Sequence, residues 1–64
     1  MSNLKRLREA KNLTQLQLSE NSGVNIRTIQ HYEQGSKDIN KAQGVILYKL
    51  AEALECDIKS LLEL

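Results

Sequence analysis

The sequence predicts an all-α domain of five short helices, and three observations support this fold class. The 64 residues contain no Pro, Phe or Trp, whereas Leu, Ile and Lys are frequent, and such a composition favours helices. Apolar residues recur at intervals of three and four, which is the helical period. Glycines and cap-forming residues separate the apolar stretches, so that the individual helices have defined starts and stops.

The first two helices are separated by a short turn. We expect the first helix over residues 3–11. Its apolar stripe consists of Leu4, Leu7 and Ala10. The second helix is expected to begin after Thr14, because Thr14 and Gln17 form the Thr-x-x-Gln pattern of a capping box. It should end near Ser22, where Gly23 can adopt the left-handed conformation of a C-terminal cap.

The third and fourth helices each follow a polar segment. Asn25 is the expected N-cap of the third helix, which should run over residues 26–34 and end at Gly35. The fourth helix is expected from residue 40 or 41 to residue 54 or 55. Its inner stripe consists of Leu47, Leu50, Ala51 and Leu54. Gly44 lies inside this range, at a cost of roughly 1 kcal/mol relative to Ala.

A short fifth helix is expected next, with Asp57 as its cap. Its apolar side consists of Ile58, Leu61 and Leu62. We expect residues 1–64 to form one complete domain, because a chain of this length has room for a single core. The expected core consists of Leu7, Leu18, Val24, Ile29, Tyr32, Leu47, Leu50, Ala51, Leu54, Ile58 and Leu61.

The charges are distributed unevenly along the chain, although the formal net charge is only +1. Residues 1–44 carry seven basic and four acidic side chains, whereas residues 45–64 carry two basic and four acidic ones. The first part therefore has a charge of +3 and the second a charge of −2. Such a division is expected when one face of a protein meets a polyanion.

Several function classes find no support in the sequence. One His and one Cys provide too few metal ligands, and there is neither a Gly-rich phosphate loop nor a nucleophile–base pattern. We therefore expect no metal, no cofactor, no small-molecule ligand and no enzymatic activity. No apolar run approaches the ~20 residues of a membrane span, and the first residues lack the apolar stretch of a signal peptide. The expected location is the cytoplasm, without attachment to a membrane.

Residues 15–34 have the organisation of a helix-turn-helix, in which two short helices are joined by a turn of about four residues that contains glycine. Gly23 redirects the chain, and Ser19 is small where the two helices cross closely. The outward face of the second of these helices carries Ile26, Arg27, Gln30, His31 and Gln34. Arg, Gln and His are side chains that read base edges, so this face is a candidate DNA-reading surface.

Four motifs in this order carry a resemblance to a known family. They are Leu13-Thr14-Gln15-x-x-Leu18, Gly23-Val24-Asn25-x-x-Thr28-Ile29, Tyr32-Glu33-x-Gly35 and Leu50-Ala51-x-Ala53-Leu54. With these motifs, the segment over residues 4–62 resembles the Cro and lambda-repressor type of helix-turn-helix domain, also called the xenobiotic-response-element family. The resemblance implies five helices, recognition of double-stranded DNA in the major groove, usually as a dimer, and regulation of transcription.

The resemblance also assigns DNA contacts to individual positions. The positions where the family meets DNA carry Asn25, Ile26, Arg27, Thr28 and His31. The positions placed for phosphate carry Gln15, Gln34 and Lys37. Gln30, on the outward face of the third helix, completes the candidate site. Arg27 is the expected base reader, because arginine pairs bidentately with guanine. Ile26 would pack on a thymine methyl group, and His31 would donate to a base edge or a phosphate. The alternative for Arg27, His31 and Gln15 is an ordinary surface position without a DNA contact.

The resemblance further places Arg8 on the first helix opposite Glu33 at the end of the third. Each of the two residues follows a core position by one step. A planar guanidinium can meet a carboxylate through two parallel hydrogen bonds. We therefore predict an at least partly buried Arg8–Glu33 salt bridge that fixes the angle between the first and third helices. The alternative is that both are ordinary surface residues.

Two further side chains have open assignments. Cys56, the only cysteine, cannot form an intramolecular disulfide, and we expect it in the core rather than as a redox sensor, because a buried thiol is inert. Tyr48 lies off the inner stripe of the fourth helix. It either covers the connection between the third and fourth helices or enters a subunit contact.

These observations predict a small transcriptional repressor that binds a short operator in double-stranded DNA as a homodimer. The alternative from another class is a protein-interaction module, such as an antitoxin or a partner that sequesters another regulator. The modest net charge leaves this alternative open. The same low charge disfavours a general DNA-compacting protein.

Overall fold

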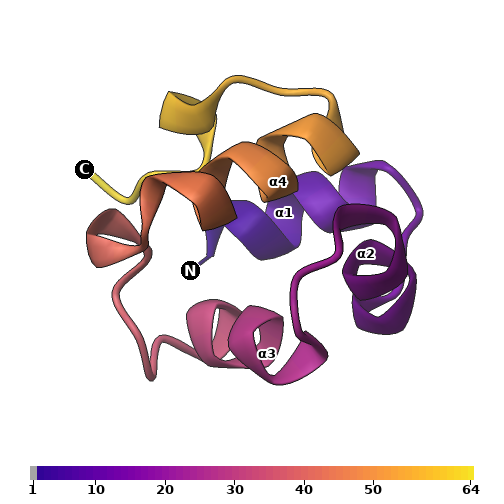
Figure 1. Ribbon diagram of the computed structural model, residues 1–64, viewed down its shortest axis with the longest axis horizontal. Coiled ribbons are helices and arrows are strands. Elements are labelled where there is room, and N and C mark those ends of the chain that lie inside the picture. The colour runs from indigo at the N-terminus through magenta and orange to yellow at the C-terminus, as the bar shows by residue number, and fades with distance from the viewer. Residues whose placement is uncertain (1) are drawn as a thin grey trace.

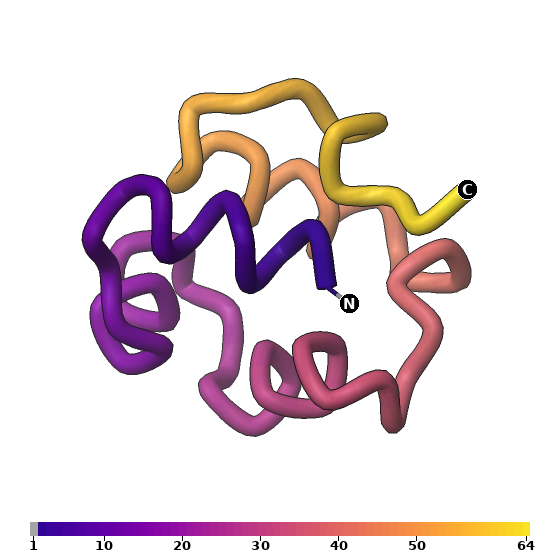
Figure 2. The backbone as a smooth tube through the Cα atoms, turned by 180° about the vertical axis from the view of Figure 1, so that it is seen from behind, coloured from indigo at the N-terminus to yellow at the C-terminus, as the bar shows by residue number. Residues whose placement is uncertain are grey.

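Four α-helices and two 3₁₀ turns make up the computed structural model, which describes residues 2–64 and has no strand within them. The helices are α1 (Asn3–Ala10), α2 (Gln15–Ser22), α3 (Ile26–Gln34) and α4 (Gly44–Leu54), and the turns are η1 (Ile39–Lys41) and η2 (Ile58–Ser60). Figures 1 and 2 show α3 along one edge of the molecule, opposite the segment that contains η2, with α2 at one end. The all-α class is confirmed, whereas the count of five helices is wrong.

Side-chain caps set the starts of the first three helices. The Ser2 hydroxyl accepts a backbone N–H of the first turn of α1 at 3.0 Å. Thr14 and Gln17 form the expected capping box at the start of α2, with hydrogen bonds of 3.0 and 2.9 Å. The Asn25 side chain accepts the N–H of Arg27 at 2.8 Å, as expected for the N-cap of α3.

Residues with a left-handed backbone conformation follow the ends of the helices. Gly23 (φ +76°) and Gly35 (φ +83°) are the C-caps of α2 and α3, as predicted, and glycine takes this conformation without the strain that a Cβ causes. Helix α1 ends at Ala10, one residue earlier than expected, and Asn12 adopts a positive φ of 58° in the turn that follows. Each helix therefore ends one or two residues before a residue with a positive φ.

The expected fourth helix is in fact two elements, because residues 42 and 43 have extended backbone conformations. Asp38 accepts the N–H of Asn40 at 3.0 Å and so begins η1, whose Ile39 is buried. Helix α4 starts only at Gly44. This glycine is the first helical residue and not an interior one, so the expected helix-propensity cost of an interior glycine does not apply.

The expected fifth helix is the single 3₁₀ turn η2. The Asn3 side chain donates to the carbonyl of Leu62 at 2.8 Å. The Asn40 side chain pairs with Glu63, accepting its N–H at 2.8 Å and donating to its carbonyl at 3.2 Å. The N–H of Glu63 is thus bound to a side chain and not to the carbonyl four residues earlier, as it would be in a longer helix. Asp57 makes no side-chain cap hydrogen bond, contrary to its expected role.

One hydrophobic core joins all four helices, the turn η1 and the residue that follows η2. It consists of Leu4, Leu18, Val24, Ile29, Ile39, Leu47, Leu50, Ala51, Leu54 and Leu61. Ile58 was expected in the core but is 39% exposed, because η2 does not continue into a helix that would cover it. Leu7, Tyr32 and Cys56 are only half-buried against the core, and Tyr48 is exposed. Among residues 2–64, no helix combines the length and the hydropathy of a membrane span.

Two isoleucines provide a matched test of this core, because each is the first residue of a 3₁₀ turn. Ile39→Ala should lower the free energy of unfolding by about 2–4 kcal/mol, since it leaves a cavity in the core. Ile58→Ala should cost about 1 kcal/mol, since Ile58 is already 39% exposed and leaves no enclosed cavity. Urea denaturation followed by circular dichroism measures both. Equal costs for the two variants would contradict the assignment.

Candidate nucleic-acid interface

Helices α2 and α3 and the turn between them form a helix-turn-helix. Val24 in the turn is buried, and both its backbone groups are satisfied by serines of α2. The hydroxyl of Ser19 donates to the carbonyl of Val24 at 2.6 Å, and the hydroxyl of Ser22 accepts its N–H at 3.1 Å. The sequence indicated only that Ser19 is small. The hydroxyl of Ser19 also holds the turn in place and thereby sets the direction in which α3 follows α2.

Helix α3 presents most of the predicted DNA-contacting residues together. Of the full set, Asn25, Arg27, His31, Gln34 and Lys37 are exposed, and Gln15, Ile26, Thr28 and Gln30 are half-buried. Arg27, His31 and Gln34 are spaced by four and three residues, so they form one stripe along the helix. The only carboxylate of α3 is Glu33, whose side chain is 3% exposed. The exposed stripe therefore carries polar and basic groups alone.

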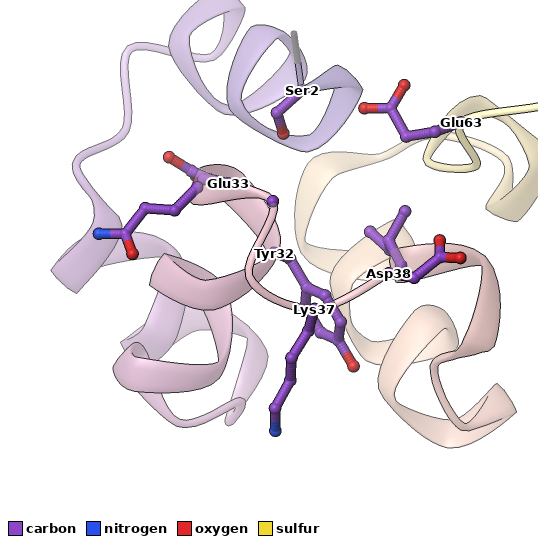
Figure 3. A pocket seen from close by; sticks show the side chains of 9 residues that line it. Ser2, Tyr32, Glu33, Lys37, Asp38 and Glu63 are labelled. Carbon is purple, nitrogen blue, oxygen red and sulfur yellow. The ribbon is translucent and has the colours of Figure 1, made fainter.

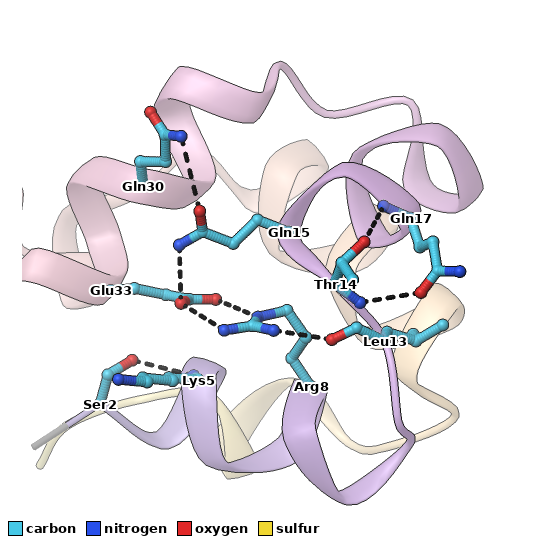
Figure 4. Close-up of polar contacts among 9 residues, drawn as sticks. All are labelled: Ser2, Lys5, Arg8, Leu13, Thr14, Gln15, Gln17, Gln30 and Glu33. Atoms are coloured by element: carbon cyan, nitrogen blue, oxygen red, sulfur yellow. Dashed lines mark hydrogen bonds and ion pairs between the residues drawn. The ribbon is translucent and has the colours of Figure 1, made fainter.

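The buried carboxylate of Glu33 is paired with Arg8 of α1, as the sequence analysis proposed (Figure 4). Arg8 Nε donates to Glu33 Oε2 at 2.7 Å, and Arg8 Nη2 donates to Glu33 Oε1 at 3.0 Å. Arg8 Nη1 also donates to the carbonyl of Leu13, at 2.6 Å, in the turn before α2. The hydrogen bonds to Glu33 raise the pKa of the Arg8 guanidinium above its ordinary value. One arginine thus ties α1 to α3 and to the approach of α2.

Gln15 at the start of α2 takes part in the same set of contacts. Its Nε2 donates to Glu33 Oε1 at 3.0 Å, and its Oε1 accepts from Gln30 Nε2 at 3.5 Å, a long hydrogen bond (Figure 4). From the sequence, Gln15 is expected only at a phosphate, because no local pattern connects it with residues 15 and 18 positions away. We refer to Arg8, Gln15, Gln30 and Glu33 as the Glu33 network.

A hollow of about 340 Å³ lies beside the C-terminal end of α3 (Figure 3). The residues labelled there are Ser2, Tyr32, Glu33, Lys37, Asp38 and Glu63. Three of them are carboxylates, which disfavour an anion in this hollow, and the Lys37 side chain points away from Ser2 and Glu63. Within the described residues, no group of three His, Cys, Asp or Glu side chains is placed to hold a metal ion.

A second hollow, of about 460 Å³, adjoins α3 on the side of α4. Its lining includes Thr28 of α3, Lys37 and Lys41 of the connection, and Gln43 before α4. Lys41 was not among the residues predicted for the site. In the sequence, only the positive charge of Lys41 pointed to this site, because its position beside α3 depends on the turn η1. Lys41 thereby joins Lys37 as a cation next to α3.

Two groups with shifted pKa values lie outside the interface. Burial raises the pKa of the Cys56 thiol, and the nearby charge of Asp57 adds to this effect, so little thiolate is present at neutral pH. The exposed carboxyl of Glu55 has a lowered pKa, because it accepts a hydrogen bond from Lys11 at 2.5 Å.

The fold and the site together define a helix-turn-helix protein. The chain matches the model of the family described as Helix-turn-helix over residues 4–61, so it belongs to this family. The match confirms the resemblance to the Cro and lambda-repressor type and supports DNA binding as the function class. No curated protein and no solved structure matches the chain in the corresponding comparisons.

A double-mutant cycle tests the buried ion pair. Glu33→Gln and Arg8→Met should each lower the free energy of unfolding by about 3 kcal/mol or more, because each leaves a buried charged group without its partner. The double variant should cost clearly less than the sum. Lys11→Met is the control, since it removes an ion pair that is exposed and contributes little. Strictly additive costs in urea denaturation would mean that Arg8 and Glu33 do not interact.

Proposed function

We propose that this chain is a transcriptional repressor that reads an operator in double-stranded DNA with α3 in the major groove, as a homodimer. The observation that carries the proposal is the outward face of α3. Arg27, His31 and Gln34 are exposed on it, and the only carboxylate of the helix is withdrawn into a buried ion pair. Such a helix meets the polyanionic groove without exposed negative charge of its own.

The reading roles follow from the chemistry of the side chains on α3. Arg27 is exposed in the first turn and is proposed to pair bidentately with guanine. Ile26, half-buried beside it, would pack on a thymine methyl group. His31 lies one turn further along and would donate to a base edge or to a phosphate. Thr28 and Asn25 complete the surface as neutral hydrogen-bonding groups.

Phosphate contacts are proposed on both sides of α3. At the start of α2, Gln15 has a second amide N–H that the Glu33 network does not use. The backbone N–H groups of Gln15 and Leu16, which precede the capped N–H of Gln17, are open to an anion. Gln34, Lys37 and Lys41 are exposed on the other side. Contacts of this kind place α3 in the groove but carry no base identity.

The homodimer is proposed because a small reading domain gains affinity and specificity when two copies occupy two half-sites. Exposed apolar side chains at Ile58 and Leu64 offer surface for such a contact near the C-terminal end of the described chain. Bound at a promoter, the dimer would act as a repressor by blocking access to it.

Selection on random DNA duplexes, followed by a salt titration, tests this function. A double-stranded operator should emerge with two related half-sites about 34–36 Å apart along the helix axis. Its affinity should fall linearly on a log–log plot as salt rises, because bound Lys and Arg release counterions. Selection of a single unsymmetrical site would contradict the proposed homodimer. No affinity for DNA at any salt concentration would instead favour a protein-interaction module.

The role of Arg27 is tested on the selected operator. Arg27→Ala should weaken binding by about 1–3 kcal/mol and relax the preference at one base pair, because a bidentate contact to guanine is lost. Arg6→Ala is the matched control, since Arg6 is an exposed arginine of α1 outside the helix-turn-helix. It should leave all base preferences unchanged. If Arg27→Ala binds the operator and its single-base variants as the unmodified protein does, α3 is not the reading helix.

A further inference from the structure

We propose that Glu33 and Gln15 are positioning residues that orient the side-chain amide of Gln30, and that Gln30 so oriented reads an adenine. This inference rests on the proposed function and adds to it a specificity-determining residue and the base that it selects. The juxtaposition that carries it is the Glu33 network, which runs from a buried arginine of α1 to the outward face of α3 (Figure 4).

The first step is that the carboxylate of Glu33 has a defined orientation. Both its oxygens are held by the guanidinium of Arg8, at 2.7 and 3.0 Å, and the two side chains are 3% and 10% exposed. A bidentate pair between two planar groups leaves little freedom to rotate. Glu33 therefore presents Oε1 toward α2 in a constant direction.

The second step is that this carboxylate determines which way the amide of Gln15 faces. An ionised carboxylate only accepts hydrogen bonds, so the amide must turn its NH₂ group, and not its oxygen, to Glu33 Oε1, at 3.0 Å. The oxygen of Gln15 is thereby directed to the other side, where Gln30 Nε2 lies at 3.5 Å. Reversing the amide would place two acceptors against each other.

The third step concerns Gln30. Because its NH₂ group is turned to Gln15, its carbonyl oxygen faces away from Gln15, as Figure 4 shows. One N–H and the oxygen remain free, side by side, as a donor and an acceptor. Adenine presents the complementary pair in the major groove, an N7 acceptor and an N6 donor. Guanine presents two acceptors there, which leave the oxygen of Gln30 without a partner.

Because Gln30 is already oriented, DNA binding costs less side-chain conformational entropy. A free glutamine on a helix surface must lose rotamer freedom before it can make a bidentate contact, and a preorganised one loses less. Gln30 is half-buried and already in contact with Gln15, whereas its neighbours Arg27 and His31 are exposed. Gln30 is thus the reading-face residue whose geometry is most determined by the protein itself.

The experiment compares Gln30→Ala, Gln15→Met and the double variant on the selected operator and on its single-base variants. The unmodified protein should prefer adenine at one position of each half-site on the order of 10-fold, and Gln30→Ala should abolish this preference. Gln15→Met should reduce it to about 3-fold or less, and the double variant should match Gln30→Ala. Asn21→Met is the matched control, since Asn21 is an exposed side-chain amide on the same helix as Gln15 and lies outside the Glu33 network. It should keep the full preference.

A measurement without DNA separates this inference from the proposed function. In the ¹⁵N-labelled free protein, Gln15→Met should shift the side-chain NH₂ resonances of Gln30, whereas Asn21→Met should leave them in place. Thermal unfolding of each variant shows that the fold is retained. If Gln15→Met weakens binding equally for all four bases, or leaves the Gln30 resonances unmoved, the positioning role is overturned while the proposed function stands. If the unmodified protein selects no DNA sequence, both fail together.

Discussion

The buried ion pair between Arg8 and Glu33 is the constraint on which the arrangement of the helices depends. A chain of this size buries only about 60% of the surface that it exposes when unfolded, so its core alone provides modest stability. The pair adds little net free energy, because desolvation offsets much of the attraction between the two charges. Its contribution is directional: two hydrogen bonds to Glu33 and one to the carbonyl of Leu13 set α1, α3 and the approach to α2 relative to one another.

The same pair decides the electrostatics of the outward face of α3. The formal net charge of +1 gives weak attraction to DNA on its own. Withdrawing Glu33 into the protein leaves α3 with an exposed stripe of Arg27, His31 and Gln34, so the local charge that a groove would meet is more favourable than the total suggests. A structural interaction thereby also serves the proposed binding surface.

Connections outside the helices position the remaining parts. Asn3 and Asn40 bind the backbone of residues 62–63, which brings the last described segment against the start of α1 and against η1. The turn η1 inserts Ile39 into the core and places Lys41 beside Thr28. These side-chain to backbone hydrogen bonds hold the connecting segments against the four short helices.

The sequence by itself determined the all-α class, the capping box at Thr14, the N-cap at Asn25 and the helix ends at Gly23 and Gly35, because each depends on residues within one helical turn. The Arg8–Glu33 pair was reached through the resemblance to a family and not through local spacing. Tertiary structure alone decided that η2 is not a fifth helix and that Gln15 binds Glu33. The physical reason is distance along the chain: the partners of these backbone and amide groups lie 18 to 59 residues away, where no periodicity or cap pattern connects them.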